Sequence, residues 1–219
     1  FISRVAVDEL ATYWPSFVAP GGRKWVLGHL SRGMASQGEV KLGFGPTQKG
    51  IDVTRLDGSL DVEGVSVDYR PPAPPVRNAT ASVKFDLDSL TVRIGGGETQ
   101  GLTITGGSAR ILEARAKPPR LDLDVRVEGT VPAALTLLAA EPFGYTKKLG
   151  FSPRDTQGNV AAELNLKLPL VDDPDLGQIK LAVGADVTNL FIAGALLGGD
   201  VTGGSLRLDV TEKGMTISG

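Results

Sequence analysis

The sequence predicts a mostly β protein whose core is one long, curled antiparallel sheet that forms an apolar groove. Three observations support this fold class. Apolar and polar residues alternate along many segments, glycines stand where that alternation changes phase, and helical periodicity is confined to two short regions. Alternation with a period of two is typical of strands that have one dry face and one wet face.

The alternating segments supply the residues that we expect to line the groove. In the segment around Leu123, for example, each apolar residue is followed by Asp, Arg or Glu. Such segments favour antiparallel strands that are half-buried. The expected lining residues are Val83, Phe85, Leu87, Leu121, Leu123, Val125, Val127, Leu164, Leu166, Leu168, Ile179, Leu181, Val183, Leu206, Leu208 and Val210.

Glycines mark the places where the alternation slips by one residue. Gly64 separates apolar residues at even positions from apolar residues at odd positions, and Gly106-Gly107 does the same further along. A phase slip at glycine indicates a β-bulge or a tight turn. Repeated bulges would curl the sheet.

Residues 1–38 are expected to form a helical lead-in, and residues 39–219 a β-groove domain. Asp8 could cap a short helix that runs through Trp14 and is stopped by Pro15. A second helix is expected from about Gly21 to Leu30. It would place Trp25, Val26 and Leu30 on one side and expose Arg23 and Lys24 to water.

A further short helix is expected within residues 132–149. Val131-Pro132 precedes an alanine- and leucine-rich segment, and proline is favoured in the first turn of a helix. This helix could cover one end of the sheet. The chain starts at Phe1 rather than Met and ends at Gly219 within an expected strand pair. We therefore expect a fragment of a larger chain.

The composition gives little support for catalysis or for nucleic-acid binding. The formal net charge is −2, whereas nucleic-acid binding requires a basic surface. Without cysteine there is no thiolate metal site. We expect no enzyme activity and no cofactor.

Three local motifs are candidate functional sites. His29 is the only histidine, and no partner for it can be identified in the sequence. Asp172, Asp173 and Asp175 suggest a calcium loop, but Pro174 divides them and the Gly and Glu of an EF-hand are missing. The glycines of 95–97 lack the Lys-Ser/Thr of a phosphate loop, so we expect a hairpin turn there.

Alternation by itself does not show whether the apolar face of the sheet is covered by protein or is exposed as a groove. A dozen strands would form a trough of roughly 55–60 Å at about 4.8 Å per strand, open to an apolar ligand. Alternatively, the sheet could fold on itself as a closed sandwich that acts as a scaffold or interaction module. Its edges could then bind partners by strand addition. A hydrolase built around His29 is a third alternative.

Several segments resemble YhdP-like proteins of the AsmA superfamily. They are spread over nearly the whole chain and keep a consistent order. The matching segments are Tyr13-Trp14-Pro15 with Pro20, Arg23, Trp25-Val26, Leu30 and Gly33; Val67-Asp68-Tyr69 with residues 71–76; residues 138–142 with Gly144-Tyr145, Leu149-Gly150 and Pro153; and residues 194–198 with Asp200-Val201-Thr202, Gly204 and Leu206.

The resemblance implies a lipid-transfer bridge. It implies a periplasmic location, with the full-length protein anchored in the inner membrane by an N-terminal helix. The ligands would be phospholipid acyl chains, carried between the inner and outer membranes along a curled β-groove. No catalytic signature exists in this family, so no catalytic residue can be transferred.

Overall fold

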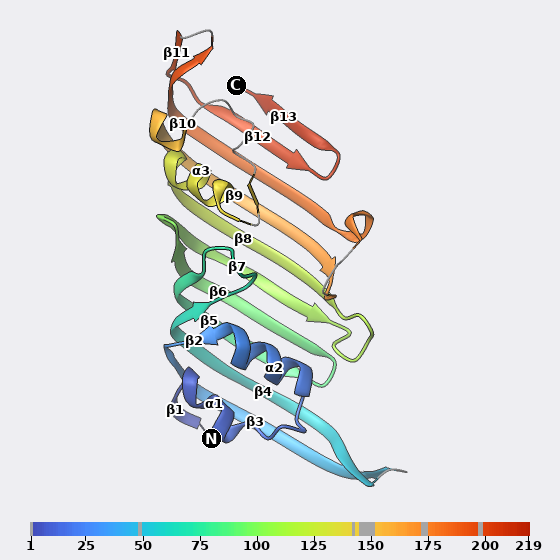
Figure 1. The fold of residues 1–219 in the computed structure, drawn as a ribbon. Coiled ribbons are helices and arrows are strands. Elements are labelled where there is room, and N and C mark those ends of the chain that lie inside the picture. The colour runs from blue at the N-terminus through green and yellow to red at the C-terminus, as the bar shows by residue number, and fades with distance from the viewer. Residues whose placement is uncertain (1, 48–49, 142, 145–151, 172–174, 197–198) are drawn as a thin grey trace.

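The fold is a single twisted antiparallel sheet with three short α-helices on one of its faces (Figure 1). The computed structural model describes residues 2–47, 50–141, 143–144, 152–171, 175–196 and 199–219. The strands are β1 (Ile2–Ala6), β2 (Leu30–Ser31), β3 (Met34–Thr47), β4 (Gly50–Val67), β5 (Val76–Asp86), β6 (Ser89–Thr99), β7 (Leu102–Leu112), β8 (Arg120–Thr130), β9 (Thr156–Pro169), β10 (Lys180–Leu196), β11 (Gly199–Thr202), β12 (Leu206–Thr211) and β13 (Gly214–Ser218). The helices are α1 (Leu10–Tyr13), α2 (Pro20–His29) and α3 (Val131–Ala139), with short 3-10 turns η1 (Val7–Glu9), η3 (Pro153–Asp155) and η4 (Leu176–Gln178).

The strands follow one another across the sheet almost in chain order. The order is β1-β3-β4-β5-β6-β7-β8-β9-β10-β12-β13, while β2 pairs with β4 and β11 pairs with β10. Each pair is antiparallel, and the sheet does not close into a barrel. The predicted fold class, a mostly β chain with one long antiparallel sheet and few short helices, is confirmed.

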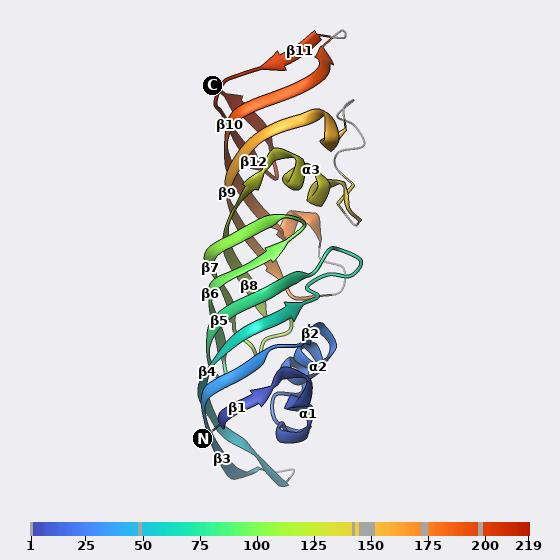
Figure 2. The ribbon, with the colours of Figure 1, turned by 90° about the vertical axis from the view of Figure 1, so that its left-hand side faces the viewer.

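The glycines at the phase slips do mark bulges. The β4–β5 register shifts between Val62 and Val65, where Gly64 has φ +69°. The β7–β8 register shifts between Ile104 and Gly106. Bulges increase the local twist and bend a strand, and Figure 2 shows that the sheet is curved along its length. Glycines 95–97, in contrast, lie inside β6 and not in a turn, so that prediction is wrong.

All three helices lie on the concave side of the sheet (Figure 2). The predicted second helix is present as α2, and α3 begins at Val131 as expected from the Pro132 signal. The Thr130 side chain accepts a hydrogen bond from the backbone N–H of Ala133 and so caps α3. The part of the predicted 132–149 helix beyond residue 144 lies outside the described residues.

Two predictions about the lead-in are wrong. A short helix, α1, does end with Trp14 as its C-cap directly before Pro15, but Asp8 does not cap it. Both carboxylate oxygens of Asp8 instead accept a hydrogen bond from the Arg32 backbone N–H at 3.1 Å. Arg23 does not face water. Its guanidinium donates to the carbonyl of Trp14 at 2.8 Å and to that of Ala11 at 3.2 Å. A long cation can satisfy the free carbonyls at the end of a preceding helix, which a periodicity argument does not reveal.

The first 38 residues also contribute strands to the sheet. β1 pairs with the start of β3, so that Ala6 lies opposite Met34 and Ile2 lies opposite Gly38. The strand period therefore begins at Met34, five residues before Glu39.

The chain has an unusually small closed core. Among the described residues, only eleven hydrophobic residues are buried, and the largest side chain that is fully enclosed is that of Val65. The accessible surface is 13839 Å², whereas a compact monomer of 22.9 kDa would expose about 9,600 Å². No second sheet covers the first within the described part of the chain. The structure is therefore not the closed sandwich that alternation left possible.

Candidate functional site

The apolar side chains of the concave face lie opposite one another from strand to strand. We call such a set of directly opposed residues a ladder. The longest ladder crosses from β1 to β13 without a polar member. Its members are Val5, Ala35, Val62, Ala81, Ile94, Gly107, Val125, Leu164, Val183, Val210 and Met215.

Further ladders run beside it. Because side chains on one face recur every second residue, neighbouring ladders are about 7 Å apart along the strands. One consists of Leu60, Val83, Val92, Ala109, Leu123, Leu166 and Leu181. A third ladder consists of Phe85, Leu90, Ile111, Leu121 and Leu168. A fourth consists of Ile104, Val127, Ala162, Ala185, Leu208 and Ile217.

The structure brings the predicted lining residues together on this face. Fourteen of the sixteen are strand residues, of which Leu206 lies opposite Val187 on a shorter ladder. The other two are at strand ends: Leu87 is in the turn between β5 and β6, and Ile179 directly precedes β10. Both are half-buried.

Sequence reasoning missed the contribution of β6 to the groove floor. Leu90, Val92 and Ile94 alternate with Thr91 and Arg93, which is the same signal that identified the neighbouring strands. The ladders cannot cross from β5 to β7 without these residues. β3 adds Val40, Leu42 and Phe44.

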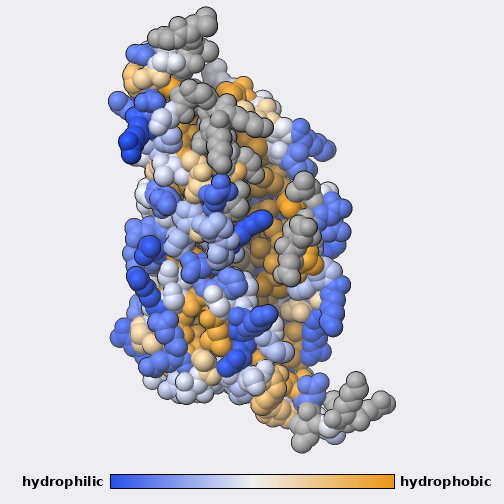
Figure 3. All heavy atoms as spheres, in the orientation of Figure 1, coloured by the Kyte–Doolittle hydropathy of each residue, from blue (hydrophilic) through white to orange (hydrophobic). Residues whose placement is uncertain are grey.

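The groove floor is accessible. Most of its residues are half-buried rather than buried, and several near the two ends of the sheet are exposed. Phe44 is 54% exposed, Met215 63% and Ile217 60%. Figure 3 shows the hydrophobic residues as a band along the hollow of the molecule, with hydrophilic residues along both margins.

The opposite face of the sheet is polar and carries ion pairs between strands. Arg110 on β7 lies 2.8 Å from the Asp122 carboxylate on β8, and Lys167 on β9 lies 3.5 Å from the same carboxylate. The convex face is therefore suited to water, and the two faces differ sharply in polarity.

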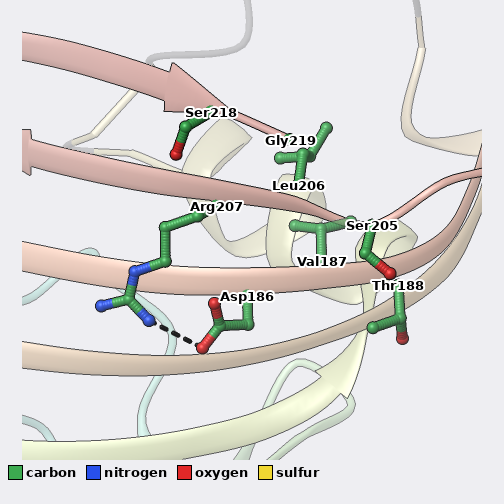
Figure 4. A pocket seen from close by; sticks show the side chains of 8 residues that line it. All are labelled: Asp186, Val187, Thr188, Ser205, Leu206, Arg207, Ser218 and Gly219. Carbon is green, nitrogen blue, oxygen red and sulfur yellow. Dashed lines mark hydrogen bonds and ion pairs between the residues drawn. The ribbon is translucent and has the colours of Figure 1, made fainter.

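Figure 4 shows the residues that line a pocket where β10, β12 and β13 meet. The pocket has a volume of about 310 Å³. The Arg207 guanidinium donates to the Asp186 carboxylate at 2.7 Å and to that of Asp209 at 3.2 Å. Hydrogen bonding and charge from Asp186, followed by Asp209, raise the pKa of Arg207. Because two carboxylates already neutralise this cation, the pocket has little to offer an anionic ligand.

Two other groups among the described residues have a shifted pKa. The backbone N–H of Asp88 and the hydroxyl of Ser89 donate to Asp86 and lower the pKa of its carboxyl group. Burial raises the pKa of the Tyr69 hydroxyl. Asp86 stabilises the β5–β6 turn and Tyr69 lies in the β4–β5 connection, so neither contributes to an acid–base pair.

The candidate motifs for catalysis and metal binding are His29 and the aspartates of residues 172–175. The His29 ring stacks on Trp25 with centroids 5.1 Å apart, and its Nδ1 lies 2.9 Å from the Trp25 carbonyl. Asp172 and Asp173 lie outside the described residues. Within the described ranges, no group of three or more His, Asp or Glu is arranged to hold a metal ion.

No helix among the described residues has the length and apolar character needed to cross a bilayer.

In comparisons with known proteins, the family model described as "YhdP protein" matches residues 2–217. No curated protein and no solved structure matches the chain.

Proposed function

Because the chain belongs to the YhdP family, we propose that its groove carries phospholipid acyl chains as a segment of a lipid-transfer bridge. The full-length protein would be anchored in the inner membrane, and this segment would stand in the periplasm on a path between the inner and outer membranes. Its role would be transport without chemical conversion of the lipid.

The uninterrupted ladder from Val5 to Met215 is the observation that carries this proposal. A closed protein buries its apolar ladders against a second layer, yet most residues of this floor are only half-buried. An extended apolar surface that is rimmed by polar residues is typical of a binding site for an apolar partner.

The energetics suit an acyl chain that slides. Burial of a methylene group stabilises by about 0.8 kcal/mol, so a sixteen-carbon chain would gain roughly 12 kcal/mol relative to water if it were fully covered. The attraction has no preferred direction, and neighbouring positions along a ladder offer similar side chains. A chain could move from one strand to the next without losing much of this free energy.

The margins of the groove suit the polar headgroup. Arg115 in the β7–β8 turn lies 3.4 Å from the Asp88 carboxylate in the β5–β6 turn, so charged side chains link neighbouring turns along this margin. A headgroup at this margin would remain in water while its acyl chains lie on the floor. Desolvation of the headgroup, which would be costly, is thereby avoided.

Photo-crosslinking from two adjacent residues tests the proposal. Leu164 lies on the groove floor, whereas Asn165 points to the opposite face of β9. A photoreactive phenylalanine analogue replaces one or the other in the purified chain, which is then mixed with vesicles of phosphatidylethanolamine and phosphatidylglycerol. After irradiation, mass spectrometry detects any covalently attached lipid.

We expect lipid adducts at residue 164 that exceed those at residue 165 by about tenfold or more. Circular dichroism of both variants checks that the sheet is intact. Equal labelling at the two positions, or none at 164 in a folded chain, would contradict the proposal.

A further inference from the structure

We propose that residues 10–29, which comprise α1, α2 and the connection between them, form a movable roof that controls access of lipid to the groove at β3 and β4. This inference rests on the function proposed above. The roof lies on the concave side of the sheet, in front of β4 in Figure 1 and beside β2 and β4 in Figure 2.

The roof meets the groove floor through an exposed aromatic contact. The Phe17 and Phe44 rings have centroids 6.3 Å apart and are tilted by 56°. Phe17 is 63% exposed and Phe44 is 54% exposed, so the contact leaves more than half of each side chain open to water. Such a contact is weaker than a fully buried aromatic pair, so it can be broken at modest cost.

Little else fixes the roof to the sheet below it. Neither α1 nor α2 has a buried residue, and Val18 is the only buried residue in the whole roof. Trp25, the largest side chain of α2, is 45% exposed and stacks on His29 of the same helix. Elements with few buried apolar contacts are those that open first in a folded protein.

Hydrogen bonds within the roof hold it together as a unit. The Trp14 indole N–H donates to the Val18 carbonyl at 2.7 Å, and Arg23 Nε donates to the Trp14 carbonyl at 2.8 Å. The first bond closes the connection between the helices, and the second ties α2 to the end of α1. These bonds connect the two helices, so opening of α2 also loosens α1 and the connection between them.

The ends of the roof are fastened to the sheet. The Asp68 N–H donates to the His29 carbonyl at 2.8 Å, and β2 pairs with the end of β4 directly after α2. At the other end, the Val7 N–H donates to the Gly33 carbonyl at 3.1 Å. Fixed ends on either side of a loosely held segment are the arrangement that a hinged cover requires.

Three glycines weaken α2 although packing does not require them. A Cβ atom added to Gly21, Gly22 or Gly28 would meet no atom within 4 Å, and their φ values are ordinary for a residue with a side chain. Glycine is among the least favourable residues in a helix because its backbone loses the most freedom there. Without a steric reason for glycine, we attribute these three to a helix that must open readily.

The experiment measures how fast the purified chain takes up a phosphatidylethanolamine whose acyl chain carries a nitrobenzoxadiazole fluorophore. The donor is a vesicle of phosphatidylethanolamine and phosphatidylglycerol. The variants are the triple substitution Gly21→Ala, Gly22→Ala and Gly28→Ala, and the single substitution Phe17→Ala. Hydrogen exchange of the α2 amides reports roof opening without any lipid.

We expect the triple variant to slow both α2 amide exchange and lipid uptake by about tenfold, with the same amount of lipid bound at equilibrium. Phe17→Ala should accelerate uptake two- to fivefold. Thr136→Ala, which raises the helix propensity of α3 away from the roof, serves as the matched control and should leave the uptake rate unchanged.

The outcomes distinguish a failure of the roof proposal from a failure of the proposed lipid-transfer function on which it rests. If the triple variant does not slow α2 exchange, or slows it while uptake stays as fast as in the unmodified chain, the roof is not a gate. In either case the groove remains a lipid site as long as the unmodified chain binds the probe. If the unmodified chain binds no probe at all, both proposals fall.

Discussion

Leu166 on β9 lies directly opposite Leu181 on β10, and both side chains face the open groove. Because Leu166 is only half-buried, Leu166→Asp should leave the chain folded and cost about 1–2 kcal/mol of unfolding free energy. An acyl chain above that position would have to desolvate the new carboxylate. Lipid affinity should therefore fall at least tenfold, as measured by titration with a fluorescent phospholipid.

Asn165→Asp is the matched control, because the same charge is added one residue away on the convex face. Its lipid affinity should equal that of the unmodified chain. A similar loss of affinity in both variants would show that net charge, and not the groove floor, governs binding.

Leu102 belongs to the small part of the concave face that is closed. It is 3% exposed and packs against Gly129. Leu102→Asp should therefore destabilise the fold by more than about 3 kcal/mol, because a carboxylate would be buried without a partner. Urea unfolding compares the free energy of unfolding of this variant with that of Leu166→Asp. An equal loss of unfolding free energy in the two variants would contradict the distinction between a closed core at Leu102 and an open floor at Leu166.

Gly107 occupies a place on the longest ladder where no side chain fits. Its φ is +153°, and a Cβ atom there would collide with the carbonyl oxygen of Asp124 on β8. Gly107→Ala should destabilise the fold by about 2–3 kcal/mol, which a urea titration would detect. Gly21→Ala, at a position with free space, should not destabilise the chain.

Thr130 connects β8 to α3 through its side chain, which accepts the Ala133 N–H at 3.3 Å. Thr130→Ala should cost about 1 kcal/mol of unfolding free energy because one N–H of the first turn loses its acceptor. Thr136→Ala, whose hydroxyl donates to a carbonyl within the same helix, should cost less. Thermal unfolding of the two variants checks the order, and the reverse order would contradict the cap.

Asp86 makes the stability of the β5–β6 turn depend on pH. Its pKa is lowered below the ordinary 3.8 by the Asp88 N–H and then by the Ser89 hydroxyl. A depressed carboxyl pKa stabilises the fold above the ordinary value, and the benefit is lost as the pH falls through the folded-state value. Between about pH 5 and pH 2, Asp86→Ala should show a flatter decline in stability than the unmodified chain; parallel curves would contradict this.

Much of the sheet could be predicted from the sequence because its strands are half-buried. A strand that has one dry and one wet face imposes a period of two, as in β8, where Leu121 and Leu123 alternate with Asp122 and Asp124. The bulge at Gly64 was visible for the same reason, since a phase slip shows only where the period is regular.

The lead-in was harder to predict because its contacts are with distant backbone atoms. Arg23 is held by carbonyls of Trp14 and Ala11, and Asp8 by the N–H of Arg32. Contacts with backbone atoms of distant residues do not produce a periodic pattern in the sequence. The pattern around Trp25 also gave no indication that its ring would stack on His29.

The open state of the groove could not be derived from alternation, because a closed sandwich and an open trough require the same pattern. The strand order settles that question. One sheet runs in chain order from β3 to β10, and the described part of the chain contains no second sheet that could cover Leu123 or Leu166.

Native mass spectrometry of the chain purified without detergent, followed by lipid extraction, would show whether the groove holds phospholipid. We expect phospholipid to co-purify, and much less to do so when Leu123, Leu166 and Leu181 are replaced together by Asp in a chain that still folds. If the unmodified chain carries no lipid and the triple replacement unfolds it, these leucines form a closed core and the groove is not a lipid path.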